Sequence, residues 1–349
     1  MFEDVNKTPS TEISKLGEFG LIEHLTSGIR PTQPSTIKGV GDDAAVAEKG
    51  NGMLSLYTTD MLVEGIHFDL MYTPYRHLGY KAAVVNFSDI YAMNGIPLQM
   101  LVSVAVSSKI SVEALEEFYE GLLQACRTYH VDLVGGDTSS SLSGMIVSIT
   151  LIGEVKKNKV VYRNGAKETD LICVSGDLGA AYLGLQVLER EKKIFKENPS
   201  VQPDLSGFDY VLERQLKPEA RKDIINWLNE NNIQPTSMID ISDGLSSELN
   251  HICKQSEKGC QIYEEKIPID IATETAASDF NLHPITCALN GGEDYELLFT
   301  SSINDFEKLK QNPQISIIGH ITEKNSECHL VSKTGEYIPL TAQGWNSFK

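Results

Sequence analysis

Carboxylates flanked by apolar residues or glycines recur along this sequence. Asp43 lies in GVGDDAAV, Asp60 in LYTTDMLV and Asp89 in VVNFSDIYAM. The same kind of setting surrounds Asp137 in LVGGDTS, Asp240 and Asp243 in MIDISDGL, and Glu293 and Asp294 in LNGGEDYELLF. An isolated carboxylate is costly to bury in such surroundings unless it is paired or binds a metal ion. The pattern therefore indicates metal-assisted chemistry.

Oxygen ligands favour a hard divalent cation, Mg²⁺ or Mn²⁺, over zinc. The sequence has neither an H-E-x-x-H motif nor the Cys/His spacing of a zinc site. An Asp after Gly or Ser is also a common turn or helix-cap residue, and that role alone would explain any one of these motifs. The occurrence of six such motifs in one chain instead favours a metal-binding site formed by several aspartates. Cations on an acidic site usually accompany a phosphate-rich substrate, because they neutralise both the ligand and the protein.

The familiar phosphate-binding signatures are nevertheless missing from the sequence. There is no Walker A loop and no protein-kinase signature. Residues 39–44, GVGDDA, formally match the dinucleotide motif G-x-G-x-x-A, but two adjacent carboxylates there would repel a pyrophosphate. If the chain handles a nucleotide, metal ions and helix N-termini must hold it in a different scaffold.

Hydrophobic periodicity predicts the elements that position these aspartates. Helices are expected over residues 17–28, 79–95 and 111–130, with Ser111 as an N-cap, and strands over residues 54–62, 100–108, 131–138 and 144–155, the last two around a Gly-Gly turn. The second half again combines strands and helices around aspartates. It has a strand ending in SMIDISDG, a helix in LSSELNHICKQ and a strand–turn–strand region in CALNGGEDYELLFT. Mixed strands and helices in both halves predict two α/β (α+β) domains, residues 1–155 and 156–349.

Composition narrows the class of protein. The chain has 349 residues, 41% of them hydrophobic, and a formal net charge of −18, which argues against a nucleic-acid partner. No stretch is apolar enough for a membrane helix, and the polar N-terminus does not resemble a signal peptide. Six dispersed cysteines without a C-x-x-C pair are expected to be reduced packing residues. A cytoplasmic location is therefore expected.

Taken together, the motifs resemble the thiamine-monophosphate kinases. This family lies within a larger group that includes aminoimidazole ribonucleotide synthetase and selenophosphate synthetase. The resemblance runs from GEFGLI at residue 17 to GWNSF at residues 344–348. It rests on the ordered set GEFGLI, GVGDDAAV, TTDMLVEGIHF, NFSDIYAMNG, GGDTS, RNGAK, IDISDGL and NGGEDYELLF. The extra N-terminal dozen residues are a departure that affects no catalytic motif.

The resemblance implies a two-domain aminoimidazole ribonucleotide synthetase-like fold, a homodimer joined through N-terminal strands, and transfer of the ATP γ-phosphoryl to thiamine monophosphate. Several Mg²⁺ ions would assist, and no catalytic general base is expected because the acceptor phosphate is already ionised. Matching motifs assign metal ligation to Asp43, Thr58, Thr59, Asp60, Asp89, Asp137, Asp240 and Asp243, with Asp42 supporting the first turn. ATP would contact Tyr119, Gly136, Asp137, Arg163 and Ser242; thiamine monophosphate would contact His67, Glu293 and Trp345.

Each non-aspartate role has an ordinary alternative. Arg163 can grip phosphate oxygens in a bidentate contact, or be a surface loop arginine. His67 can donate to a phosphate or pack in its loop. Glu293 can pair with an aminopyrimidine or have a structural role in a turn. Trp345 can stack on a cationic ring or be a packing residue.

Two rival functions also stay open. One is an ATP-dependent synthetase acting on a formylglycinamidine or similar nucleotide, and the other is a nucleotide- or metal-binding module without turnover.

Overall fold

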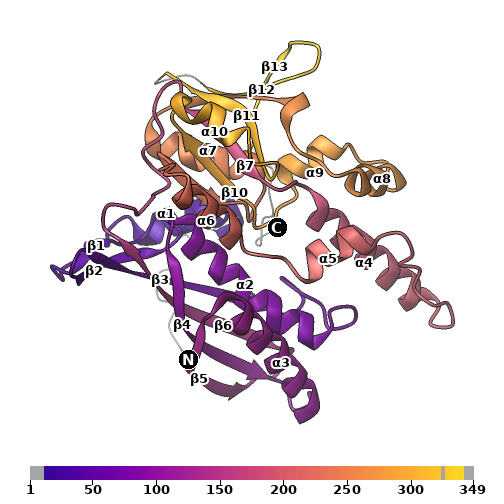
Figure 1. Cartoon of the computed structure of the whole chain (residues 1–349). Helices are drawn as coiled ribbons and strands as arrows, with labels where there is room; N and C mark the ends of the chain where they lie inside the picture. Colours follow the sequence, from indigo (N-terminus) through magenta and orange to yellow (C-terminus); the bar gives the residue numbers. More distant parts are fainter. Residues whose placement is uncertain (1–11, 324–326, 342–349) are drawn as a thin grey trace, which may run out of the picture.

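Two mixed β-sheets, one in each half of the chain, organise the molecule (Figure 1). The computed structural model describes residues 12–323 and 327–341. The N-terminal half forms a six-stranded sheet in the order β1-β2-β3-β6-β4-β5. Its elements are η1 (Ile13–Lys15), α1 (Gly17–Thr26), β1 (Thr36–Lys38), β2 (Ala45–Gly50), β3 (Met53–Val63), α2 (Tyr75–Ala92), β4 (Ile96–Val106), α3 (Val112–Tyr129), β5 (Asp132–Ser140) and β6 (Ile146–Lys156).

The C-terminal half forms a seven-stranded sheet in the order β13-β12-β9-β11-β7-β10-β8. The predicted α/β class is therefore confirmed, and the predicted boundary at residue 155 falls at the end of β6. The elements of this half are β7 (Leu171–Ser175), α4 (Ala180–Glu197), α5 (Asp209–Leu216), α6 (Lys222–Glu230), β8 (Ser237–Asp240), α7 (Leu245–Ser256), β9 (Gly259–Tyr263), η2 (Glu264–Lys266), α8 (Ile271–Asp279), α9 (Pro284–Asn290), β10 (Leu297–Ser301), η3 (Ile303–Asp305), α10 (Phe306–Leu309), β11 (Ile315–Thr322), β12 (Cys328–Val331) and β13 (Tyr337–Pro339).

Helix α2 joins the two halves. It packs on α3 and on β3, β4 and β6 of the first sheet, and also contacts β8 and α5 of the second half (Figure 1). Most of its residues are buried, including Phe87 and Ile90, which are fully inaccessible. A helix that is apolar nearly all round is stable only when its surroundings cover it on several sides. This packing carries Asp89, in the last turn of α2, to the place where the two halves meet.

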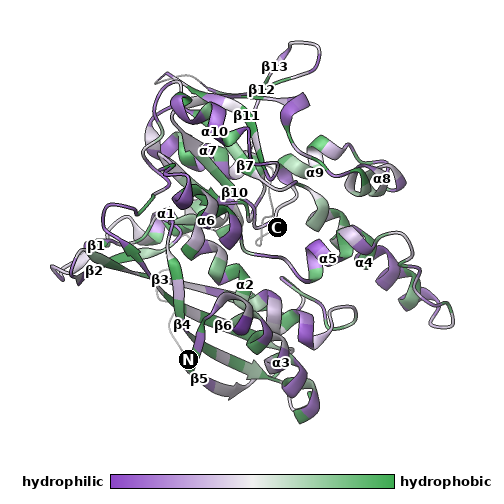
Figure 2. Ribbon diagram, in the orientation of Figure 1, coloured by the Kyte–Doolittle hydropathy of each residue, from purple (hydrophilic) through white to green (hydrophobic). Residues whose placement is uncertain are grey.

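In the part of the chain that the structure describes, helices α2 and α3 cover one face of the first sheet and leave the other uncovered (Figure 1). Along β3 and β6, buried residues alternate with more accessible ones, as expected for strands whose side chains point to opposite faces. Figure 2 shows that hydrophobic and hydrophilic residues both occur along these strands. The uncovered face carries several exposed apolar side chains, among them Tyr57, Met61 and Leu101. Within the described residues, no helix combines the length and the apolar character needed to cross a bilayer.

Most predicted elements are confirmed, and two expectations were wrong. Gly135 and Gly136 lie inside β5 rather than in a turn, because the chain turns later, at residues 141–145. CALN, expected as a strand, is the end of α9, which starts with Pro284 at its first position. Ser111 caps α3 as predicted, its hydroxyl accepting a hydrogen bond from the backbone N–H of Ala114 at 3.2 Å.

Candidate active site

Three of the predicted aspartates meet at the junction of the two halves. Asp43 lies in the loop before β2, Asp89 in the last turn of α2, and Asp240 at the end of β8. Each offers a carboxylate oxygen, and these oxygens lie within 4.8 Å of one another. Residues nearly two hundred positions apart thus form one cluster, which we call the aspartate triad.

Strand β3 adds two of the predicted ligands to the triad. Side chains alternate along a strand, so Thr58 and Asp60 point to the helix-covered face that holds Asp89. The Thr58 hydroxyl donates to Asp89 Oδ2 at 2.5 Å. Thr59 points to the opposite face, where its hydroxyl donates to the carbonyl of Ile149 at 2.9 Å. The structure thus places Thr59 away from the triad of the same chain.

Burial and mutual repulsion make the ionised triad unfavourable. Burial raises the pKa of Asp43 to about 7 and the pKa of Asp240 to about 6. The pKa of Asp89 is raised well above its usual range, first by burial and then by the charges of Asp60, Asp240 and Asp43. Asp43 Oδ2 is buried and accepts no hydrogen bond from any described residue. An all-oxygen cluster with an orphaned buried carboxylate oxygen has the ligand chemistry that Mg²⁺ requires.

Arg163 supplies a positive charge beside the triad. Its guanidinium donates to Asp43 Oδ1 from Nη2 at 2.7 Å and from Nε at 3.2 Å. Its backbone N–H donates to Asp42 Oδ1 at 3.1 Å, and Lys38 forms an ion pair with Asp42 at 3.2 Å. Asp42 therefore anchors the Arg163 loop to the GVGDD turn.

The loop after β8 carries Ser242 and Asp243 to the start of α7. The backbone N–H groups of Ser242 and Asp243 donate to Glu248 Oε1 at 3.3 and 2.9 Å. Glu248 is buried, and burial, followed by the charge of Asp243, raises its pKa well above the usual range. This residue was missed in the sequence, although a Glu in the first turn after a Ser/Asp-rich loop is a helix-start signal.

Gly136 and Asp137 lie on β5, the edge strand beside β4. A Cβ atom added at Gly136 would lie 1.8 Å from the carbonyl oxygen of Val102, so only glycine allows the two strands to approach this closely. Asp137 pairs with Ser103 of β4 and is exposed; it is not a member of the triad.

This close approach gives a testable prediction. We expect Gly136→Ala to push β5 from β4, lowering the free energy of unfolding by about 1–3 kcal/mol and displacing Asp137. The adjacent Gly135→Ala is the matched control, since its nearest contact would be Leu101 Cδ2 at an ordinary 3.4 Å. Denaturant unfolding of both variants measures the difference, and equal stabilities would contradict the steric argument.

Two of the three residues predicted to bind thiamine monophosphate lie in the described part of the chain. His67 is exposed, and its Nδ1 accepts from the backbone N–H of Val63 at 3.1 Å. Glu293 forms an ion pair with Lys81 at 3.1 Å and accepts from Gln215 at 2.9 Å. Trp345 lies outside the described residues.

Tyr119, predicted to face the ATP base, lies on α3. There it packs edge-on against Phe118, whose carbonyl oxygen lies close to Gly79 near the start of α2. Asp89 is ten residues further along α2, or about 15 Å at 1.5 Å per residue. Tyr119 and the triad therefore lie near opposite ends of the same helix.

A family model and several known proteins match the sequence of this chain. Residues 41–155 match the family model described as "AIR synthase related protein, N-terminal domain". The thiamine-monophosphate kinase of Bacillus subtilis is 36% identical over 343 residues, covering 96% of this chain and all of that protein. That of Aquifex aeolicus is 35% identical over 314 residues, covering 89% and 93%.

The chain belongs to the thiamine-monophosphate kinase family. A solved structure of AaThiL complexed with AMPPCP and TMP superposes with a TM-score of 0.81 at 31% identity, over 97% of this chain and 99% of that one. A hydrogenase maturation protein HypE in complex with ATP, at 17% identity and a TM-score of 0.67, shares the fold alone. The family, the kinase class and the fold expected from the motifs are thereby confirmed.

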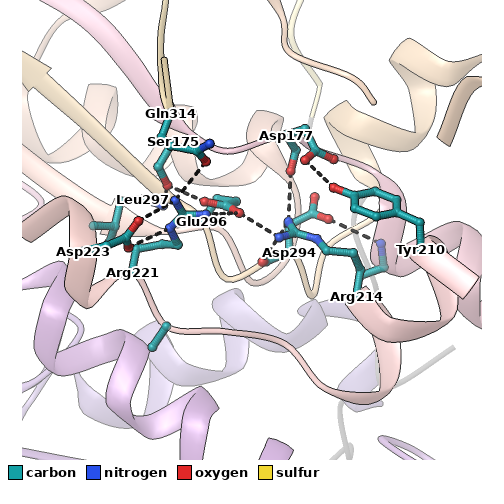
Figure 3. Close-up of polar contacts among 12 residues, drawn as sticks. Ser175, Asp177, Tyr210, Arg214, Arg221, Asp223, Asp294, Glu296, Leu297 and Gln314 are labelled. Carbon is teal, nitrogen blue, oxygen red and sulfur yellow. Dashed lines mark hydrogen bonds and ion pairs between the residues drawn. The ribbon is translucent and has the colours of Figure 1, made fainter. Parts of the chain in front are cut away.

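In this thiamine-monophosphate kinase family member, a buried ion-pair network supports the NGGEDYE segment (Figure 3). Glu296 is fully buried and pairs with Arg214 at 2.9 Å and Arg221 at 3.0 Å. Ser175 also donates a hydrogen bond to Glu296. Asp294 accepts from the backbone N–H of Gly179 at 2.8 Å, at the start of α4.

Sequence reasoning missed Arg214 and Glu296 as structural residues. Neither stands in a short motif with its partner, since 82 positions separate them. The adjacent Gln215 holds Glu293, so helix α5 links this network to a residue predicted to bind substrate.

Proposed function

We propose that the chain transfers the γ-phosphoryl group of ATP directly to the phosphate of thiamine monophosphate, giving thiamine diphosphate and ADP. The observation that carries this proposal is the aspartate triad at the junction of the two halves. A relative with nearly complete coverage was solved with AMPPCP and TMP, which supports an ATP-type donor and this acceptor.

In this proposal, Asp43, Asp89 and Asp240 hold Mg²⁺ together with Thr58 and Asp60. Thr59 and Asp137, which lie away from the triad, and Asp243 stay predicted ligands of further ions. When bound, the ions supply the positive charge that lets two phosphate-bearing substrates approach each other. The residues of the chain mainly bind and orient. Arg163 can present two N–H donors to phosphate oxygens. The acceptor phosphate is ionised near neutral pH, so no side chain needs to remove a proton.

The two halves take different parts in the proposal. Residues 1–155 supply most of the proposed ligands of ATP and Mg²⁺, to which the second half adds Arg163, Asp240 and Asp243, and they form a homodimer through the uncovered face of the first sheet, where Tyr57 and Met61 are exposed. Residues 156–349 complete the thiamine monophosphate site with Glu293 and Trp345. A cytoplasmic location belongs to the same proposal, because ATP and a reducing environment for six free cysteines are found there.

One assay tests the reaction directly. The full-length chain is incubated with ATP, Mg²⁺ and thiamine monophosphate, and thiamine diphosphate and ADP are quantified by chromatography. We expect the two products in equal amounts. Thiamine, which lacks the acceptor phosphate, is the matched control and is expected to yield no thiamine diphosphate. Failure to form thiamine diphosphate above a no-enzyme blank would overturn the proposal, and ADP formed only with a different acceptor would point to the synthetases.

The raised pKa values predict how pH affects the metal-free chain. Between about pH 4 and pH 7 the folded triad binds more protons than the unfolded chain, so the triad's contribution to stability falls as the pH rises. One pKa unit corresponds to about 1.4 kcal/mol. We therefore expect Mg²⁺ to raise the free energy of unfolding by about 2–4 kcal/mol more at pH 8 than at pH 5.

Denaturant unfolding at both pH values, in EDTA and in excess Mg²⁺, measures this difference. A Ca²⁺-free NaCl solution with the same ionic strength as the Mg²⁺ solution controls for the screening of charges by salt. An Mg²⁺ effect of the same size at pH 5 and pH 8 would contradict the proposed role of the triad.

A further inference from the structure

Three of the six cysteines converge although they are separated in the sequence. Cys253 lies in the last turn of α7, Cys260 on β9 and Cys328 on β12. Their sulfur atoms lie within 4.8 Å of one another. Cys253 and Cys260 are buried, and Cys328 is partly accessible. We call this group the cysteine triad; it lies in the second sheet and shares no residue with the aspartate triad.

The fold holds these sulfur atoms on one side of the sheet. Strands β9 and β12 are parallel, with Cys260 directly opposite Cys328. Neighbouring strands are about 4.8 Å apart, so the two side chains stand next to each other. Helix α7 packs on both strands and brings Cys253 onto the same pair.

The spacing is close to that of a metal–thiolate centre. With metal–sulfur bonds of about 2.3 Å, tetrahedral ligands lie about 3.8 Å apart. The widest sulfur–sulfur separation therefore needs to shrink by about 1 Å at most. Simple packing of three small hydrophobic side chains does not require their polar atoms to converge in this way.

A surface opening reaches the cysteine triad. A pocket of about 590 Å³ is lined by Cys253, Cys328, Asn250, Lys254, Lys258 and Glu327, among others. It gives a metal ion a route of entry and lets solvent water reach a fourth coordination position. The two lysines offset part of the negative charge of three thiolates.

We propose that Cys253, Cys260 and Cys328 form a binding site for one thiophilic d¹⁰ cation, Zn²⁺ or Cu⁺. Such ions select thiolate ligands, whereas Mg²⁺ selects the oxygen ligands of the aspartate triad. The chain would thus carry two chemically distinct cation sites, and the sulfur site stands whether or not the proposed kinase reaction is correct.

Cobalt is the optical probe for this site. The full-length, fully reduced chain is titrated with Co²⁺ in excess Mg²⁺, and the near-ultraviolet sulfur-to-cobalt charge-transfer absorption is recorded. We expect this absorption to saturate at about one ion per chain and to disappear when Zn²⁺ is added. Oxygen ligands of the aspartate triad give no such band. A parallel anaerobic titration against a chromophoric Cu⁺ chelator tests the second ion.

Variants locate the ligands. Cys328→Ala and Cys260→Ala are expected to lose the charge-transfer absorption, whereas Cys126→Ala, a buried cysteine of α3, keeps it. Circular dichroism verifies that each variant is folded. The proposal is overturned if the reduced wild-type chain binds neither ion at the sulfur atoms, if it forms only a disulfide on oxidation, or if folded Cys328→Ala retains the full absorption. The wild-type titration decides the matter even where a variant fails to fold.

Discussion

Asp89→Asn is expected to lower thiamine diphosphate formation by about 10²–10³-fold while making the metal-free protein more stable. The pKa of Asp89 is raised well above its usual range, by burial and then by three neighbouring carboxylates. Asparagine keeps its size and still accepts the Thr58 hydrogen bond, but it removes the charge that would hold Mg²⁺. It also removes the repulsion from Asp60, Asp43 and Asp240. Opposite changes in activity and stability are typical of a ligand site rather than of a structural residue.

Turnover is measured at saturating Mg²⁺ and both substrates, and stability by thermal unfolding in EDTA at pH 8. Asp305→Asn is the matched control, because Asp305 also accepts from a hydroxyl group, that of Ser301 at 2.8 Å, but lies outside the cluster. It should leave turnover unchanged. Near-normal turnover of Asp89→Asn, or a lower melting temperature in EDTA, would show that Asp89 has a different role.

Arg214→Met is expected to lower the free energy of unfolding by about 3–5 kcal/mol. Its guanidinium lies between the buried Glu296 carboxylate and the carbonyl oxygen of Asp177, 2.9 and 3.0 Å away (Figure 3). Methionine retains much of the volume but leaves Glu296 with Arg221 as its remaining cationic partner. Removing one partner of a buried ion pair is costly because the other charge stays desolvated.

A second substitution tests that explanation. Adding Glu296→Gln to Arg214→Met removes the buried carboxylate that has lost one of its two cationic partners, and it should recover part of the lost stability. Arg76→Met is the control, since Arg76 and its partner Glu120 are both more than half exposed, and such pairs contribute about 0–1 kcal/mol. If the single and double variants are equally unstable, loss of packing rather than buried charge explains the effect.

The sequence by itself determined much of the site and the helices around it. Aspartates in apolar, glycine-rich motifs identified Asp43, Asp89 and Asp240, because an unpaired carboxylate is too costly to bury by chance. Local signals also placed α2 and α3, and Ser111 as the cap of α3. These features depend on residues close together in the chain, which is why pattern and spacing were sufficient.

Only the tertiary structure decided which residues meet. Local pattern did not separate Thr58 from Thr59, whereas strand alternation directs only Thr58 to Asp89. The sequence predicts a turn at Gly136. This residue lies inside β5 instead, where the close approach of β4 leaves no space for a Cβ atom. Two groups of residues that are far apart in the chain could not be recognised from the sequence. They are the Arg214–Arg221–Glu296 network and the cysteine triad of Cys253, Cys260 and Cys328. Such contacts arise from helix and strand packing over long sequence separations, so no local motif records them.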